Sequence, residues 1–573
     1  MSDLAFLRDS TRIVQDFLTT AIVVDDQAFL FAEEAQDESF RHKQPLIVPA
    51  RQAVDKPTPA LTTSSGNSSH DKVDETESQR KESRISAQDQ TLNGKLLIDR
   101  FGEFGVVCSV IRPHKTELKK LHETLKRFAP IADVFVLDWV LYGDVTGENT
   151  KALIRTLVSD LETDGDGRIR LIVVYTGETD LEQVTEEVKK GLDWFKGEIK
   201  KERFSVILPG TGTRIVVYGK DGTIRVEDAA KRSITVDQLP DTVVREFAEI
   251  SRGLLPNAVM ASITAIRRNA HQLLSRFPSS LDPAFVTQSI LICPEKASEQ
   301  IVPLIASEIA SILEDARIGE LIEAKHLREW LDHRIESKLC NPPTNSRVTR
   351  EEYKAGFEKM IEDGASKEKL KVLAEQHANF RNEIVPGDRK KVAKAITARL
   401  ASTTIESTGD AKLAMLMSLR HRYEGAKPQL SLGAVVANTH PKNGVEVTDY
   451  WVCLQPVCDS VRLKSNRSFP FVPLNLVDDT NEHVIVVEEG GDVRYLQGKY
   501  NPYLIEMIEF APGQNEQVFA ENLGGRPTFT SMDGRNFTWI AELRPAHAQR
   551  IAHRVAVEVG RIGLVESEWG RIK

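Results

Sequence analysis

The stretch DVFVL at residues 133–137, followed directly by Asp138, decides the fold of the first part of the chain. After Asp133 it is an apolar run typical of a buried strand, and a carboxylate follows it. Similar runs occur in AIVV at 21–24, GVVCSVI at 105–111 and RLIVVYT at 170–176. Amphipathic helical patterns follow at 115–128, 149–161 and 181–200. This alternation predicts βαβ units, and therefore a doubly wound α/β domain with a parallel sheet.

Three carboxylates follow two of the predicted strands. Asp25 and Asp26 come after the first strand, and Asp138 comes after the third. Ligands of an open parallel sheet collect at the carboxyl ends of its strands, and the first and third strands are neighbours in a common strand order. Carboxylate oxygens are the ligands that Mg²⁺ prefers. We therefore expect a magnesium site formed by Asp25, Asp26 and Asp138.

Two further polar groups end later strands. Thr176 closes the fourth strand, where its hydroxyl can hydrogen-bond a phosphoryl oxygen. Lys220 closes the run RIVVYGK, where its ammonium can pair with the same phosphate. Asp138 can then act as a nucleophile on phosphorus. The predicted catalytic residues are Asp138, Thr176 and Lys220.

This set of residues resembles the response-regulator receiver family over roughly residues 10–225. The resemblance implies the flavodoxin-like strand order. It also implies that Asp138 is the phosphoacceptor, that Asp26 is the more direct metal ligand, and that Asp25 acts through water. Thr176 and Lys220 would then be the pair that switches on phosphorylation.

The sequence departs from the family pattern around the fifth strand. An extra apolar run, RFSVILP at 203–209, precedes the run that ends on Lys220. If this extra run is the fifth strand, Leu208 occupies the lysine position; we favour Lys220, because IVVYGK reproduces the family pattern. Asp221 replaces the usual proline, and Tyr218 is one residue out of register with the usual switch aromatic. A shift of one residue turns a strand side chain to the other face, so we expect phosphoryl acceptance without the standard aromatic readout.

The pattern changes along the chain and predicts three domains. A receiver-like domain at 1–230 contains a polar insertion at about 50–95 that we expect to be disordered. A helical middle domain follows at 235–425, with its clearest helix at 244–277. A β-rich domain at 428–573 ends in a helix that Pro545 opens.

Net charge, cysteine distribution and the length of apolar runs argue against several classes of protein. The chain has 573 residues and a formal net charge of −9, which makes a dedicated nucleic-acid binder an unfavoured class. Its five cysteines are scattered, and the N-terminal residues lack the regions of a signal peptide. No apolar run approaches the roughly 18 residues that a membrane span needs. We expect a cytoplasmic protein that contacts neither membrane nor nucleic acid.

The resemblance implies a signalling protein whose partner is a histidine-kinase-like ATPase or a phosphotransfer protein. By analogy, such receivers with long insertions occur in bacterial antiviral defence, and the helical region can pair two copies into a homodimer. Any enzymatic activity would be autocatalytic phosphoryl transfer to Asp138. Two alternatives remain open: a pseudo-receiver scaffold that is never phosphorylated, and an effector enzyme with a site near Cys453, Cys458 and Asp459.

Overall fold

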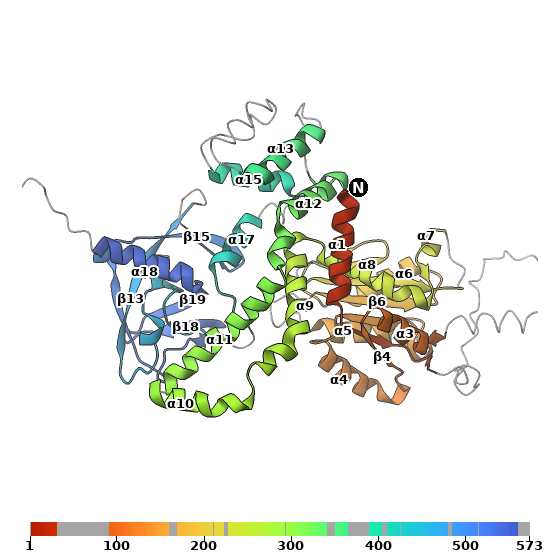
Figure 1. The fold of residues 1–573 in the computed structure, drawn as a ribbon, viewed down its shortest axis with the longest axis horizontal. Coiled ribbons are helices and arrows are strands. Elements are labelled where there is room, and N and C mark those ends of the chain that lie inside the picture. The colour runs from red at the N-terminus through yellow and green to blue at the C-terminus, as the bar shows by residue number, and fades with distance from the viewer. Residues whose placement is uncertain are drawn as a thin grey trace, which may run out of the picture. The chain divides into compact units, whose positions relative to one another are not determined.

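The structure is a computed structural model, and the chain divides into two compact units, Met1–His333 and Arg334–Lys573 (Figure 1). The described residues are 2–30, 91–159, 169–209, 211–222, 227–292, 294–340, 350–364, 389–403, 409–423, 426–478, 484–513 and 515–559. Most of the predicted insertion lies outside them. Among the described residues, no helix is both long and apolar enough to span a bilayer.

The first unit is built around an eight-stranded sheet in which five parallel strands are ordered β4-β1-β5-β6-β9. Their bounds are β1 (Thr20–Val24), β4 (Val107–Ile111), β5 (Val134–Asp138), β6 (Arg170–Thr176) and β9 (Thr213–Lys220). By position in the chain this order is 2-1-3-4-5. The predicted fold class and its flavodoxin-like strand order are confirmed.

Three short strands extend this sheet on the side of β9. An antiparallel edge lies beside β9 and consists of β8 (Ser205–Leu208) and β7 (Lys200–Lys201). β10 (Ser233–Ile234) runs parallel to the end of β9 and pairs with Gly219 and Lys220. The run at 203–209 is therefore an outer edge strand, and β9 is the strand beside β6.

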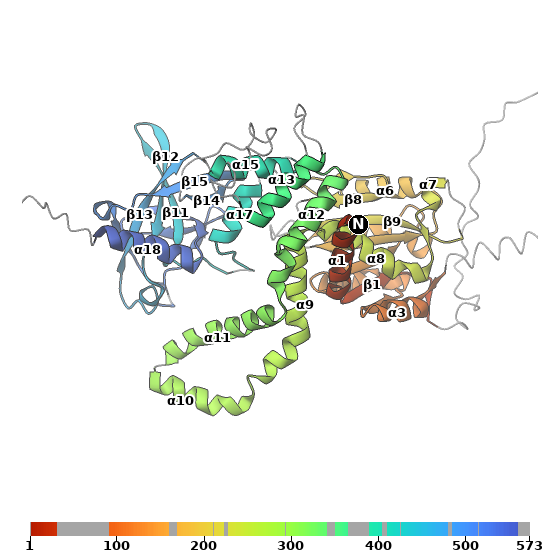
Figure 2. The same ribbon diagram turned by 45° about the horizontal axis from the view of Figure 1, so that its top comes forward.

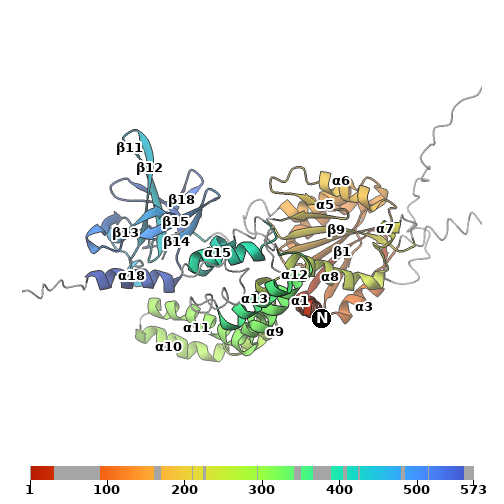
Figure 3. The ribbon, with the colours of Figure 1, turned by 90° about the horizontal axis from the view of Figure 1, so that it is seen from above.

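Helices cover both faces of the sheet (Figure 3). One face carries α4 (Leu118–Phe128), α5 (Glu148–Val158) and α6 (Leu181–Lys190). The other carries α1 (Ser2–Phe17), α3 (Gly94–Glu103) and α8 (Leu239–Ser251). Every residue of β5 and β6 is buried, which explains why these strands read as continuous apolar runs rather than alternating ones.

A short pair of parallel strands connects the residues before position 31 with those after position 90. β2 (Ala28–Phe29) pairs with β3 (Leu92–Asn93), and α3 begins directly after β3. The Asn93 side chain caps that helix by accepting a hydrogen bond from the Leu96 amide. The described residues on either side of residues 31–90 therefore lie next to one another.

A helical hairpin follows the sheet within the first unit (Figure 2). It consists of α9 (Leu254–Ser275), α10 (Asp282–Ile292) and α11 (Pro294–Asp315), and α12 (Ala324–Glu336) comes after it. The helix expected at 244–277 is interrupted, because α8 ends at Ser251 and α9 begins at Leu254. Gly253 precedes α9, and Pro256 lies in its first turn, where the missing N–H removes no helical hydrogen bond.

The second unit contains a nine-stranded antiparallel sheet, ordered β14-β15-β13-β12-β11-β19-β18-β17 with β16 beside β13. The strands are β11 (Ala434–Lys442), β12 (Val445–Cys453), β13 (Arg467–Val477), β14 (Ile485–Glu489), β15 (Asp492–Gly498), β16 (Glu506–Phe510), β17 (Glu521–Leu523), β18 (Arg526–Thr530) and β19 (Asn536–Glu542). Its helices are α13 (Arg350–Asp363), α15 (Arg389–Leu400), α17 (Gly409–Ser418) and α18 (Pro545–Val559). The β-rich C-terminal fold and its final helix are confirmed, while the three-domain division stays a prediction.

Candidate functional site

The carboxyl ends of three parallel strands bring two carboxylates and one ammonium together. Asp25 follows β1, Asp138 ends β5 and Lys220 ends β9. The Lys220 Nζ lies 2.9 Å from Asp25 Oδ2 and 2.9 Å from Asp138 Oδ1. The three side chains are only 3–6 % exposed. The ammonium is therefore a buried bridge between two carboxylates.

The pairing of β9 explains why Lys220, and not Leu208, reaches the two carboxylates. β9 runs parallel to β6, so that its carboxyl end lies at the same edge as Thr176. β8 runs antiparallel to β9, and Leu208 lies opposite Thr213 at the start of that strand. Leu208 therefore lies beside the amino end of β9, at the end of the strand opposite to Lys220.

Burial and charge set the protonation of this site. Burial raises the pKa of Asp138 to about 7, because the loss of water outweighs the attraction of the nearby Lys220 ammonium. Burial alone would lower the pKa of Lys220, but Asp138 and Asp25 outweigh it and hold that pKa above its usual value. The lysine therefore stays charged, while the Asp138 carboxyl titrates close to neutral pH.

Asp26 adds a third carboxylate beside the pair. Its Oδ2 accepts a hydrogen bond of 2.9 Å from the Tyr142 amide, and burial raises its pKa. Its Oδ1 is buried and has no hydrogen-bond partner among the described residues. Asp25, Asp26 and Asp138 each offer an oxygen, and these oxygens lie within 4.8 Å of one another. An unpartnered carboxylate oxygen in an all-oxygen cluster fits the ligand preference of Mg²⁺.

The loop after β5 is held by contacts that the sequence did not predict. The Thr150 hydroxyl donates to the Asp138 carbonyl at 2.7 Å and fixes the end of the strand. Tyr142 has a φ of 59°, a left-handed conformation that is costly for a residue other than glycine. This conformation accompanies the amide bond from Tyr142 to Asp26. Backbone strain of this kind is concentrated at functional sites.

Gly147 lets the same loop pack closely. Its φ is 68°, and a Cβ built there would lie 2.2 Å from the ring of Trp139. Trp139 directly follows Asp138 and is buried. A side chain at position 147 would therefore displace the residue next to Asp138.

Thr176 lies at the same edge of the sheet. It is fully buried at the end of β6, one residue beyond Tyr175, which pairs with Asp138. Its hydroxyl oxygen accepts a hydrogen bond of 3.1 Å from the Glu178 amide. The five residues singled out from the sequence therefore all lie at the carboxyl ends of β1, β5, β6 and β9.

Comparison with known protein families agrees with this arrangement. Residues 17–225 match the family model described as the response receiver domain. This part of the chain is a divergent receiver domain. No curated protein and no solved structure was found to match the chain.

The aromatic residue near the end of the receiver's fifth parallel strand is held by a neighbouring helix. Tyr218 is buried on β9, and its hydroxyl donates to Glu246 of α8 at 2.5 Å. The guanidinium of Arg232 lies over the Tyr218 ring, 4.7 Å from its centre. Glu246 also pairs with Arg214 and Arg232, at 3.1 and 3.0 Å. These contacts tie the strand that carries Lys220 to α8.

Replacing Tyr218 with phenylalanine is expected to destabilise the receiver domain by about 1.5–3 kcal/mol, because a buried hydrogen bond to a carboxylate is lost while the ring remains. Urea unfolding measures this change. Tyr142→Phe is the matched control, since the Tyr142 hydroxyl is buried without a hydrogen-bond partner among the described residues. Equal losses in the two variants would contradict a specific role for the bond to Glu246.

The cysteines of the second unit do not form a metal cluster in the described part of the chain. Cys453 is buried, and burial raises its pKa to about 12, so that its thiol is unreactive at neutral pH. Cys458 is exposed, and its sulfur lies 3.7 Å from an oxygen of Asp459. Of the two, only Cys458 is accessible for chemistry.

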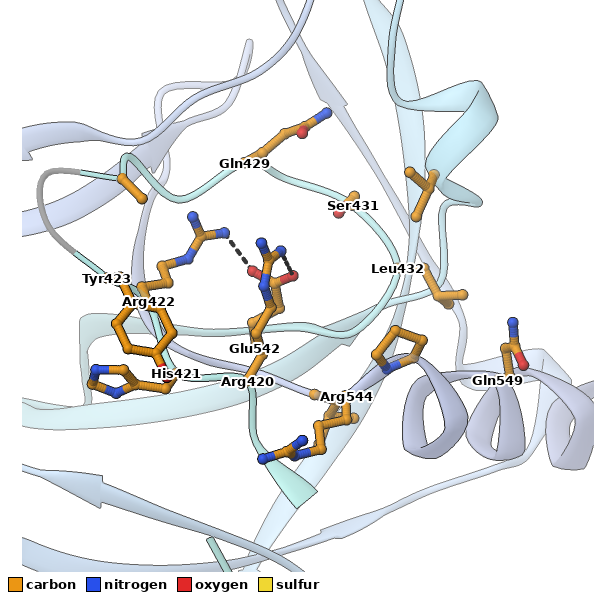
Figure 4. Close-up of a pocket in the computed structure, with 14 residues that line it drawn as sticks. Arg420, His421, Arg422, Tyr423, Gln429, Ser431, Leu432, Glu542, Arg544 and Gln549 are labelled. Atoms are coloured by element: carbon orange, nitrogen blue, oxygen red, sulfur yellow. Dashed lines mark hydrogen bonds and ion pairs between the residues drawn. The ribbon is translucent and has the colours of Figure 1, made fainter. Parts of the chain in front are cut away.

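The second unit also contains a cavity of about 690 Å³ beside the start of α18 (Figure 4). Arg420, Arg422 and Arg544 line it together with one carboxylate, Glu542. Both Arg420 and Arg422 pair with Glu542, and Arg544 donates to the carbonyls of Leu416 and Leu419. These bonds anchor the segment before β11 to the end of β19, so the arginines have a structural role in the fold.

Proposed function

We propose that the receiver domain accepts a phosphoryl group on Asp138. The observation that carries this proposal is the buried cluster of Asp25, Asp26 and Asp138 with Lys220 between two of them. An Asp138 carboxylate oxygen would attack phosphorus, the bond from phosphorus to the donor's leaving group would break, and an acyl phosphate would form. The ionised form of Asp138 is the nucleophile, and its pKa of about 7 leaves that form available at neutral pH.

Asp25, Asp26 and Asp138 would hold Mg²⁺. When bound, this ion neutralises charge on the transferred phosphoryl group. Lys220 is already 2.9 Å from Asp138, so its ammonium can pair with a phosphoryl oxygen on the same carboxylate. Thr176, at the end of the neighbouring strand, would donate its hydroxyl to another phosphoryl oxygen.

The change at Asp138 would reach the rest of the chain through β9 and α8. A shift of Lys220 toward the phosphoryl group moves the strand that Tyr218 ties to Glu246. α8 leads directly into α9 and the helical hairpin. We propose the β-rich second unit as the output domain of this signal.

The partner in this proposal is a histidine-kinase-like ATPase or a phosphotransfer protein in the cytoplasm, and bacterial antiviral defence is the proposed setting. A homodimer through the helical region is part of the same proposal. The helical hairpin exposes large apolar side chains that a second copy would bury, including Val259, Leu274, Ile290 and Val302.

A pseudo-receiver scaffold is the second candidate, and the hydrogen bond from Tyr218 to Glu246 favours it. An aromatic ring fixed in this way cannot swing as a free switch residue would. The effector enzyme remains a third candidate at Cys458 and Asp459, for which the accessible thiol is the supporting observation.

Phosphoryl acceptance is tested by incubating the full chain with acetyl phosphate and Mg²⁺ and measuring its intact mass. We expect a single phosphoryl adduct that Asp138→Asn abolishes. Asp193→Asn is the control, because Asp193 is an exposed carboxylate of the same unit. Beryllofluoride, a phosphoryl mimic, should change the shape or oligomeric state of the parent chain only. If the parent chain takes up no phosphoryl group, phosphoryl acceptance is excluded, and the scaffold and the effector enzyme are the remaining candidates.

A further inference from the structure

A second group of metal-ligating side chains lies away from the phosphoacceptor site. Asp9 of α1 and His326 and Glu329 of α12 each offer one ligand atom, and the three atoms lie within 4.8 Å of one another. We propose that these three side chains form a binding site for a divalent transition-metal ion. The site would link the first helix of the receiver unit to α12.

The spacing of residues on the two helices places these side chains together. His326 and Glu329 are three residues apart and therefore share one face of α12. His333 lies four residues further along that face, and its ring stacks on Phe6 of α1 at 5.5 Å between centres. Phe6 and Asp9 are likewise three residues apart on α1. The stacked rings fix the distance between the helices one turn from the proposed site.

Two atoms of the group are buried without partners. Neither His326 Nδ1 nor Glu329 Oε2 has a hydrogen-bond partner among the described residues. A buried polar atom of this kind costs about 1–3 kcal/mol when nothing satisfies it. A metal ion bound through His326 Nδ1 and Glu329 Oε2 would remove this cost.

Charge also favours a divalent ion at this position. Two ionised carboxylates and one neutral imidazole carry a net charge of −2, which a divalent cation balances. Two cations pair with these carboxylates: Arg12 lies 4.0 Å from Asp9, and Lys325 lies 3.9 Å from Glu329. Both are 70 % exposed, so solvent weakens their attraction.

The mixture of one nitrogen and two oxygen ligands selects the class of metal. Imidazole favours transition metals such as Zn²⁺ over Mg²⁺, which prefers oxygen alone. The oxygen-only cluster at Asp25, Asp26 and Asp138 therefore prefers a different metal from this group. Three protein ligands would leave a position for water, as in other three-ligand zinc sites.

The test is zinc binding by the full chain after treatment with a chelator, measured by calorimetry with excess Mg²⁺ present. We expect one tight site, whose affinity His326→Ala lowers by roughly 100-fold or more, because a direct ligand contributes at least as much as the outer partners of a ligand. His271→Ala is the matched control, since His271 is an exposed histidine of α9. Glu329→Gln keeps the size of the side chain and should weaken binding as well.

Thermal unfolding separates loss of the site from loss of the fold. Without metal, Glu329→Gln should melt like the parent chain, and Zn²⁺ should raise the melting temperature of the parent but not of the variant. The proposal is overturned if the parent chain binds no Zn²⁺, or if both variants bind it as the parent does. It is equally overturned if thiol alkylation or Asp138→Asn, rather than His326→Ala, abolishes binding.

Discussion

Replacing Lys220 with alanine is expected to lower the free energy of unfolding of the receiver domain by about 3–5 kcal/mol. The ammonium lies 2.9 Å from both Asp25 and Asp138, and all three side chains are buried. Its removal leaves two carboxylates facing one another without a cation, and one of them must take up a proton or be hydrated. Urea unfolding followed by circular dichroism measures the loss.

Lys231→Ala is the control for this variant. Lys231 is 70 % exposed and pairs with Asp228 at 3.4 Å, so its loss should change stability by less than about 1 kcal/mol. Mg²⁺ should stabilise Lys220→Ala more than it stabilises the parent chain, because the added ion replaces a missing positive charge. An unfolding midpoint unchanged by Lys220→Ala would show that the ammonium does not bridge the two carboxylates.

Mg²⁺ affinity is expected to fall by roughly 100-fold between about pH 8 and about pH 5, because the proton competes for a carboxyl group whose pKa is near 7. Burial raises the pKa of Asp138 to about 7 from the usual 3.8, and the ion binds only the ionised form. Calorimetric titration with Mg²⁺ at several pH values measures how the Mg²⁺ affinity changes with pH. Asp138→Asn removes the titrating group, so its remaining Mg²⁺ binding should depend much less on pH.

The same pKa shift has a consequence for stability without metal. The folded state holds the Asp138 proton more tightly than the unfolded state does, so the stabilisation is complete below the usual pKa of 3.8. It is lost as the pH rises toward 7. Mg²⁺ should reverse this trend at neutral pH. A metal-free receiver whose stability rises steadily over this range in the parent, but not in Asp138→Asn, would contradict the direction of the shift.

Much of the fold was predictable because the parallel strands are buried on both faces. Runs such as VFVL at 134–137 are apolar throughout, and the first polar residue after such a run marks its carboxyl end. This rule alone located Asp25 and Asp138. The position of Lys220 was harder to predict, because two apolar runs competed for the place beside β6 and only the pairing of strands separates them.

Contacts between residues far apart in the sequence were beyond prediction. The left-handed conformation of Tyr142 has no local signal such as glycine or asparagine at that position. The group formed by Asp9, His326 and Glu329 joins positions more than 300 residues apart, and each is an ordinary polar residue on an amphipathic helix. Gly147 offered a partial signal, because a glycine before a helix often marks a positive φ, but its contact with Trp139 depends on packing.

The parallel pair of β2 and β3 provides a site at which a fluorescent reporter protein can be inserted into this receiver. Residues 28–29 and 92–93 are held side by side whatever length of chain joins them, and doubling such a length costs only about 0.6 kcal/mol of closure entropy. A fluorescent protein could therefore replace the intervening residues with the sheet kept intact. Because β2 begins two residues after Asp26, such a reporter would be attached close in sequence to the carboxylates.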